Sequence, residues 1–236
     1  MAFELVGIIS STQALSYAFG GWEPPWGIVF VLDSANVYLV LLVAFVSVIA
    51  TLYAYTMLAR EIAVEDLPKA YAVWLLAIAS LFGLAMTGDA FNLFVFLEIS
   101  ALSSITLIAL GAGQDRRALL AAYNYLIIGA IGATFYVIGV GYLYAATGSL
   151  NLIDIIDRLN ELGTNQAAIT GLAFMLAGIM VKAGVFPVHI WLPAAYSYAP
   201  SAVSSLLAAV ATKVAIYYFA RLLFGIFIDI TQLVDF

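Results

Sequence analysis

The chain has 236 residues, of which 65% are hydrophobic and 9% are charged, and its formal net charge is −6. A soluble domain carries about 25% charged residues. This chain therefore cannot cover a water-facing surface, and its composition indicates a protein that crosses a lipid bilayer several times. With no cysteine and one histidine, it offers no disulfide, cysteine-ligated cluster or bis-histidine haem site. We expect no cofactor and no metal in this chain.

Apolar windows of about twenty residues predict the membrane spans. A weak or partial span at 3–19 comes first, and the segment GGWEPPWGIVFVLD that follows favours a turn or short hairpin at the membrane interface. Six clear spans are predicted at about 34–58, 70–88, 90–111, 118–146, 167–195 and 201–228. We expect an all-α integral membrane bundle over 34–236, preceded by an N-terminal region, 1–33, that holds the partial span and the hairpin.

The longest connection, residues 147–166, has the pattern of an amphipathic helix on the membrane surface. Its predicted apolar stripe is Ile153, Ile156 and Leu159, opposed by Asp154, Asp157 and Glu161.

Loop charges predict the orientation, because cytoplasmic loops are enriched in Lys and Arg. Arg60, Lys69, Arg116 and Arg117 lie in or beside the loops 59–69 and 112–117. The opposite side carries Arg158 alone until Arg221. We expect a multi-pass protein of the cell (plasma or inner) membrane, with the first two loops cytoplasmic and the 147–166 loop external.

Small residues recur in the 118–146 span. Gly129 and Ala133 are four residues apart, as are Gly132 and Tyr136. This spacing places each pair on one face of a helix and predicts close packing against a neighbouring helix.

Three charged residues lie well inside predicted spans and away from their ends: Glu98, Lys182 and Lys213. Each isolated charge at the bilayer centre costs about 2.5–3.5 kcal/mol on insertion scales, so these side chains should be paired or hydrated. One interpretation is a structural ion pair that holds helices together. We favour the other, a polar path across the membrane, because one acid, two bases and a nearby histidine exceed what an ion pair needs.

The stretch IMVKAGVFPVHIWLP, residues 179–193, contains Lys182 and the only histidine, His189. Proline removes a backbone hydrogen bond and disfavours the preceding helical turn. In lipid, the freed backbone must be satisfied by protein or by water. We expect a transmembrane helix broken at Pro187 and Pro193, with a hydrated pocket that His189 lines.

These groups suit proton transfer. A buried lysine releases its proton more readily, and a nearby carboxylate makes it hold that proton. Movement of Glu98 would thus switch Lys182 between keeping a proton and passing it to His189 or Lys213. Arginine could not act in this way, because it stays charged, whereas an unperturbed histidine titrates near neutrality.

Asp89 lies in TGDAFN, between two predicted spans. We favour it as the N-cap of the helix that starts at residue 90. A role at an entry or exit point for protons is the alternative.

Three stretches resemble a known family. They are TGDAFNLFVFLEISALSS, DRRALLAAYNYLIIGAIGATFYVIGVGYLYAATGSL and KAGVFPVHIWLPAAYSYAPSAVSSLLAAVATKVAIYYFAR. They are similar to the antiporter-like membrane subunits shared by complex I, Mrp-type cation/proton antiporters and membrane-bound hydrogenases. The stretch TGDAFNLFVFLE is most similar to the Mrp D-type subunit. The resemblance extends from about residue 18 to the end of the chain.

The resemblance implies a role for each matching residue. Glu98 matches the glutamate of the family's fifth helix, and Lys182 matches the lysine of its broken seventh helix; these two would form the switching pair. Lys213 matches the lysine of the eighth helix, on the central hydrophilic axis. His189 matches the histidine of the block FPxHxWLP.

The chain departs from the family in two respects. After WLP the family usually has an acidic residue, where this chain has AAYSYAP. Family members have about fourteen helices, built as two inverted repeats. By this resemblance, we expect the chain to correspond to the first repeat with one flanking helix, without the second half. We therefore expect a subunit completed by another chain, or a shortened form with a partial path.

The leading hypothesis is a proton- or proton/sodium-translocating module of a larger membrane-bound redox or antiporter complex. It would perform no redox chemistry of its own. Its expected partners are other membrane subunits, including one supplying the second half, with peripheral redox subunits, the lipid bilayer and no nucleic acid. The alternative is a structural or assembly subunit without a complete ion path. A self-contained transporter of an organic solute is disfavoured, because a single half offers no inverted partner repeat.

Overall fold

The computed structural model describes residues 14–163 and 165–227. Most of the predicted partial span at 3–19 lies outside these residues. The described chain begins with a two-stranded antiparallel hairpin of β1 (Ala14–Ala18) and β2 (Val29–Asp33), in which Ala14 pairs with Asp33. A 3-10 turn at Phe19–Gly21 follows β1.

The other regular elements of the described chain are helices. The helices are α2 (Asn36–Glu61), α3 (Leu67–Met86), α4 (Ala90–Ala109), α5 (Arg117–Thr147), α6 (Leu152–Leu162), α7 (Gln166–Ala183), α8 (Trp191–Tyr198), α9 (Ser201–Leu206) and α10 (Thr212–Leu222). Short 3-10 helices lie at Val64–Asp66 and Leu110–Gly113, and π-helical segments lie at Leu207–Ala211 and Leu223–Phe227.

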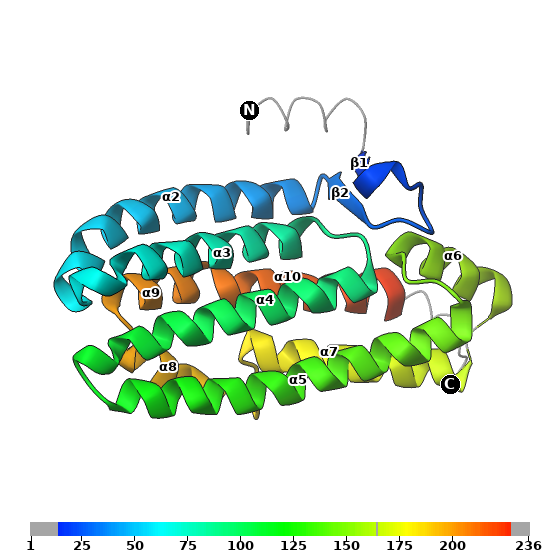
Figure 1. The fold of residues 1–236 in the computed structure, drawn as a ribbon. Coiled ribbons are helices and arrows are strands. Elements are labelled where there is room, and N and C mark those ends of the chain that lie inside the picture. The colour runs from blue at the N-terminus through cyan, green and yellow to red at the C-terminus, as the bar shows by residue number, and fades with distance from the viewer. Residues whose placement is uncertain (1–13, 164, 228–236) are drawn as a thin grey trace.

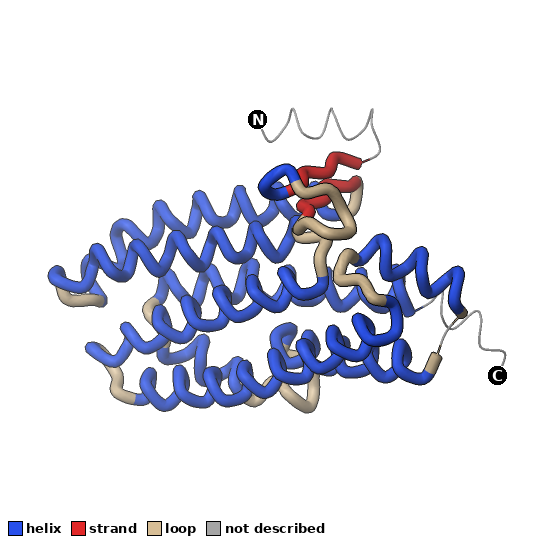
Figure 2. The backbone as a smooth tube through the Cα atoms, turned by 45° about the vertical axis from the view of Figure 1, so that its right-hand side comes forward, coloured by secondary structure: helices blue, strands red, loops and turns tan. Residues whose placement is uncertain are grey.

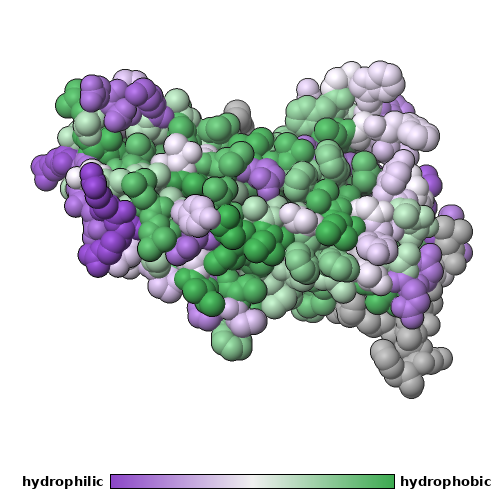
Figure 3. All heavy atoms as spheres, turned by 60° about the horizontal axis from the view of Figure 1, so that its bottom comes forward, coloured by the Kyte–Doolittle hydropathy of each residue, from purple (hydrophilic) through white to green (hydrophobic). Residues whose placement is uncertain are grey.

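Six helical segments of the described residues are long and apolar enough to cross a membrane. They are Asn36–Glu61, Val64–Met86, Ala90–Gly113, Arg117–Thr147, Gln166–Ala183 and Ser201–Gly225. Figure 3 shows that, on the face drawn there, most hydrophilic residues gather at the two ends of the molecule, with hydrophobic residues between them. The chain is therefore a multi-pass membrane protein, and its all-α membrane fold is as predicted.

The long helices run side by side along the bundle (Figure 1). α4 packs between α3 and α5, and α7 packs between α5 and α10. The hairpin lies over the end of the bundle at which α6 is found (Figure 1, Figure 2). α7 starts at this end and stops partway along the bundle, and α8 lies beyond it towards the opposite end (Figure 1).

In the 147–166 connection, the side chains that pack against the bundle are not the same set as the predicted apolar stripe. Helix α6 forms, but it buries Leu152, Ile155 and Leu159, and Ile153 is 54% exposed. At the first residue of the helix, the Leu152 N–H donates to the carbonyl of Gly88 at 2.9 Å. This bond ties the start of α6 to the segment just before α4.

Candidate functional site

Lys182 lies in the last turn of α7, and its side chain is buried, with 8% of the residue exposed. The helix ends because Gly184 adopts a left-handed conformation, with φ 68°. The N–H of Gly184 then donates to Val181 O, and that of Val185 to Met180 O. This pair of bonds is the Schellman motif. The helix therefore stops at Gly184, three residues before Pro187.

Glycines let α7 approach α5 closely enough to bury Lys182 between them. A Cβ atom on Gly178 would lie 2.5 Å from the carbonyl oxygen of Gly132, and one on Gly139 would lie still closer to that of Gly171. Neither position has room for a side chain, because backbone cannot yield as a flexible side chain can. Gly132 belongs to the stretch in which the sequence predicted close packing.

The hydrogen-bond partner of Lys182 is Tyr125, a residue of α5 that sequence reasoning did not identify. The Lys182 ammonium donates to the Tyr125 phenol oxygen at 2.7 Å, and 2% of Tyr125 is exposed. A signal existed in the sequence: Tyr125 precedes Gly132 by seven residues, which puts both on one face of the helix.

Glu98 and Lys182 line the same small cavity, together with Tyr125. The space that the centre of a water-sized sphere can reach there is about 20 Å³, and about 10–15 Å³ of such space holds one water. No ion pair joins Glu98 to Lys182 in the described part of the chain. The predicted pair is thus brought to one cavity without direct contact between its charges.

His189 lies in the turn between α7 and α8, near the ring of Phe186, with 5.8 Å between their centroids. Its Nδ1 is buried and has no hydrogen-bond partner among the described residues. Pro187 is exposed in the same turn, and Pro193 lies in the first turn of α8, where proline is tolerated.

Lys213 does not join the Lys182 cavity. It lies in α10, directly after the π-helical segment Leu207–Ala211, and its side chain is exposed. Its ammonium donates to the carbonyl of Ala208 and to the hydroxyl of Thr212, both within the same helical rod.

Asp89 is the N-cap of α4, as its position in the sequence suggests. Its carboxylate accepts the Asn92 N–H at 2.7 Å. Burial raises the pKa of Asp89, and hydrogen bonds from the backbone of Asn92 and Phe91 oppose that rise. Asp89 and Arg158 line a second cavity of about 310 Å³ beside the hairpin.

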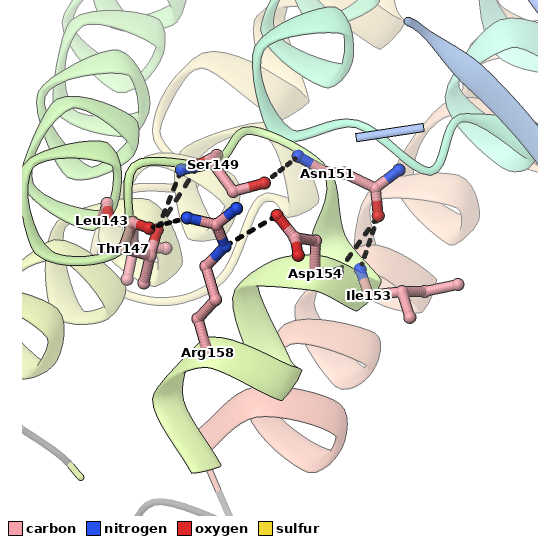
Figure 4. A network of polar contacts seen from close by, with 7 residues as sticks. All are labelled: Leu143, Thr147, Ser149, Asn151, Ile153, Asp154 and Arg158. Atoms are coloured by element: carbon pink, nitrogen blue, oxygen red, sulfur yellow. Dashed lines mark hydrogen bonds and ion pairs between the residues drawn. The ribbon is translucent and has the colours of Figure 1, made fainter. Parts of the chain in front are cut away.

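Arg158 is held in a polar network at this end of the bundle (Figure 4). Its guanidinium pairs with Asp154 at 2.9 Å and donates to the carbonyl of Thr147 at 2.9 Å. The Asn151 side chain caps α6 by accepting the N–H groups of Ile153 and Asp154. A hydrogen bond from Ser149 and then the Arg158 pair lower the pKa of Asp154.

No group of three or more His, Asp or Glu side chains that could hold a metal ion occurs within residues 14–163 and 165–227. Fold and site together define a class: polytopic helical membrane proteins with ionisable side chains enclosed between their spans.

The family is shown by comparison with known proteins. Residues 87–234 match the family described as NADH:quinone oxidoreductase/Mrp antiporter, TM, and the chain belongs to that family. It is 48% identical over 208 residues to NADH-quinone oxidoreductase subunit N of Desulforudis audaxviator, covering 88% of this chain and 41% of the relative. It is 33% identical over 228 residues to the D-type subunit of the Na(+)/H(+) antiporter of Bacillus subtilis, covering 96% and 45%.

Solved structures agree with this assignment. The structure of an archaeal membrane-bound sulfane sulfur reductase matches with a TM-score of 0.86 and 31% identity, covering 94% of this chain and 44% of that one. The Mrp complex from Dietzia sp. matches with a TM-score of 0.84 and 27% identity, covering 97% and 41%. The chain spans less than half the length of the proteins it matches here.

Proposed function

We propose that this chain is a proton- or proton/cation-translocating module of a larger membrane complex. The observation that carries the proposal is Lys182, a lysine buried between membrane spans, in one cavity with Glu98 and without an ion pair to it. An ionisable side chain between membrane spans without an opposite charge is costly to keep, and such side chains mark ion and proton paths. This cost favours a functional role for Lys182.

In the proposed cycle, Lys182 carries the proton and Glu98 controls it. When the Glu98 carboxylate is close, the ammonium form of Lys182 is favoured, and when Glu98 withdraws, the proton can leave. The cavity between them has space for about one water, which can bridge the two side chains without a large movement of either helix.

The proton leaves towards His189. The chain there is non-helical between α7 and α8, which is compatible with membrane depth only where protein or water surrounds it. The unpartnered Nδ1 of His189 fits a site that exchanges protons with water or with a neighbouring group. We propose Pro187 and Pro193 as the residues that prevent helix from reforming across this gap.

The path would continue through Lys213. Its exposed ammonium should face polypeptide outside the described residues, because exposure to lipid would cost about 2.5–3.5 kcal/mol. We propose that this polypeptide supplies the second half of the path. Two matched structures are of complexes, an archaeal respiratory membrane complex and an Mrp complex, which supports membrane subunits as partners. Peripheral redox subunits remain a further expectation.

Loop charges support an orientation in which 59–69 and 112–117 are cytoplasmic and 147–166 is external.

The ion is either H⁺ alone or H⁺ exchanged for another cation. The relative in Bacillus subtilis is named as a Na(+)/H(+) antiporter subunit, and one in Rhizobium meliloti as a probable K(+)/H(+) antiporter subunit.

The test is ion transport by proteoliposomes that contain the intact membrane complex, with Lys182→Ala or Glu98→Ala in this chain. We expect both variants to assemble and both to lose transport. Lys69→Ala is the matched control, because the Lys69 side chain is 77% exposed and pairs with Asp66 at the start of α3. Unchanged transport in both site variants would favour the alternative, a structural subunit.

A further inference from the structure

Tyr125 is held rigidly beside Lys182. Its ring stacks on Trp191 of α8, with 4.3 Å between centroids and 15° between planes. Trp191 is itself fixed, because its indole N–H donates to the carbonyl of Val181 at 3.0 Å. The phenol oxygen is thus kept at one place against the end of α7.

The phenol and the Glu98 carboxylate approach Lys182 from different helices, α5 and α4, across one cavity. An ammonium group has three N–H donors, and the structure uses one of them for Tyr125. Hydrogen bonds to charged groups are about twice as strong as neutral ones. The hydrogen bond to Tyr125 therefore helps to determine the position of the Lys182 ammonium.

We infer that Tyr125 is a positioning residue of the ion path, whose phenol oxygen competes with the Glu98 carboxylate for the Lys182 ammonium. The inference rests on the proposed function. In the arrangement observed, Lys182 is held by Tyr125 and is apart from Glu98. In the other arrangement, Lys182 turns to Glu98 and leaves the phenol. The competition keeps the two arrangements close in free energy, so that the gain or loss of one proton shifts the equilibrium between them.

Few of the helices around Lys182 bring a titratable side chain close to it. α4 contributes Glu98, and α5 contributes Tyr125. α10 also packs on α7, but the ammonium of its Lys213 is bonded within its own rod. Loss of the phenol therefore leaves Glu98 as the main acceptor and should trap Lys182 beside it.

The first experiment measures transport in proteoliposomes of the intact complex with Tyr125→Phe, which keeps the ring and its stacking on Trp191. We expect transport to fall roughly tenfold, the size expected for one hydrogen bond to a charged group, and its pH profile to shift. Tyr123→Phe is the matched control, because Tyr123 lies two residues away in α5 and is 57% exposed. Tyr136→Phe controls for the loss of a buried phenol, since Tyr136 bonds to Ala90 O instead.

The second experiment needs no transport. The chain has three lysines, Lys69, Lys182 and Lys213, so a complex with Nζ-labelled lysine in this chain gives few signals from it by nuclear magnetic resonance. Loss of one signal in Lys182→Ala assigns Lys182. We expect Tyr125→Phe to shift that signal and Tyr123→Phe to leave it in place.

The outcomes separate this inference from the function on which it rests. If Lys182→Ala and Glu98→Ala stop transport while Tyr125→Phe transports normally with an unshifted pH profile, the role of Tyr125 is refuted and the ion path stands. An unshifted Lys182 signal in folded Tyr125→Phe refutes that role as well. If Lys182→Ala and Glu98→Ala both transport normally, the proposed function itself fails.

Discussion

Lys182 and Lys213 are two lysines that the sequence places in predicted spans, and their surroundings differ. Lys182 is buried and donates to Tyr125 of a different helix. Lys213 is exposed and donates to Ala208 within its own helical rod. Tertiary packing positions the first lysine, and local structure positions the second. Replacing Lys182 should therefore disturb the interior of this chain. Replacing Lys213 should disturb only the polypeptide that contacts the exposed side of α10.

The largest expected effect is on transport. Lys182→Ala should lower it by at least about 100-fold, the lower range for removal of a group that transfers protons. Lys182→Arg should not restore it, because arginine does not release its proton. Transport in proteoliposomes of the intact complex is the measurement. A fully active Lys182→Arg variant would show that charge alone suffices.

The same pair of sites can be compared by stability. Lys182→Ala leaves the Tyr125 phenol without its partner and should destabilise the fold by about 1–3 kcal/mol. Lys213→Ala removes bonds that lie within one helical rod and leaves no buried group of another described helix without its partner, so it should destabilise the fold less than Lys182→Ala does. Thermal unfolding in detergent measures both. Equal losses would contradict the different surroundings described above.

Close packing of α5 on α7 is what encloses Lys182, and it can be broken directly. Gly178→Ala would place a Cβ 2.5 Å from Gly132 O and should cost about 1–3 kcal/mol through overpacking. Gly141→Ala is the matched control in α5, because nothing lies within 4 Å of its added Cβ. Thermal unfolding should separate these variants, and equal melting temperatures would refute the packing argument.

Two substitutions of Asp89 can distinguish its role as a helix cap from a role in proton entry. Asp89→Ala removes the cap of α4, the helix that carries Glu98, and should cost about 1 kcal/mol. Asp89→Asn keeps an oxygen that can accept the Asn92 N–H, so its stability should stay near that of the wild type. Its transport should also be unchanged if Asp89 only caps the helix. Impaired transport with normal stability would instead identify Asp89 as part of the path.

The smallest effect is expected at the Asp154–Arg158 pair of α6, because both side chains are partly exposed. The folded-state pKa of Asp154 is lowered, first by Ser149 and then by Arg158. Its stabilising effect is thus present above its ordinary pKa of 3.8 and is lost as the pH falls through the folded-state value. Asp154→Asn should cost a few tenths of a kcal/mol at pH 6, and the difference from wild type should shrink below pH 3.8. Melting temperatures across this pH range provide the measurement, and a difference that grows on acidification would contradict the assigned direction.

Composition and residue spacing were enough to assign the class of the protein. A chain with 9% charged residues and long apolar windows suits a lipid environment, so the six spans, the cap at Asp89 and the set of charges within predicted spans followed from local composition and spacing. The family also followed, because long blocks of residues match in order.

Tertiary structure decided the contacts of those charges and the rotation of α6. Hydrophobic periodicity gives a helix its apolar face only approximately, and in α6 the bundle buries Leu152 and Ile155 while Ile153 is exposed. Local pattern also placed the end of α7 at Pro187, whereas the structure ends it at Gly184. Tyr125 could become the partner of Lys182 only through the close approach of α5 and α7, two helices distant in sequence, which the backbone contacts at Gly132 and Gly178 permit.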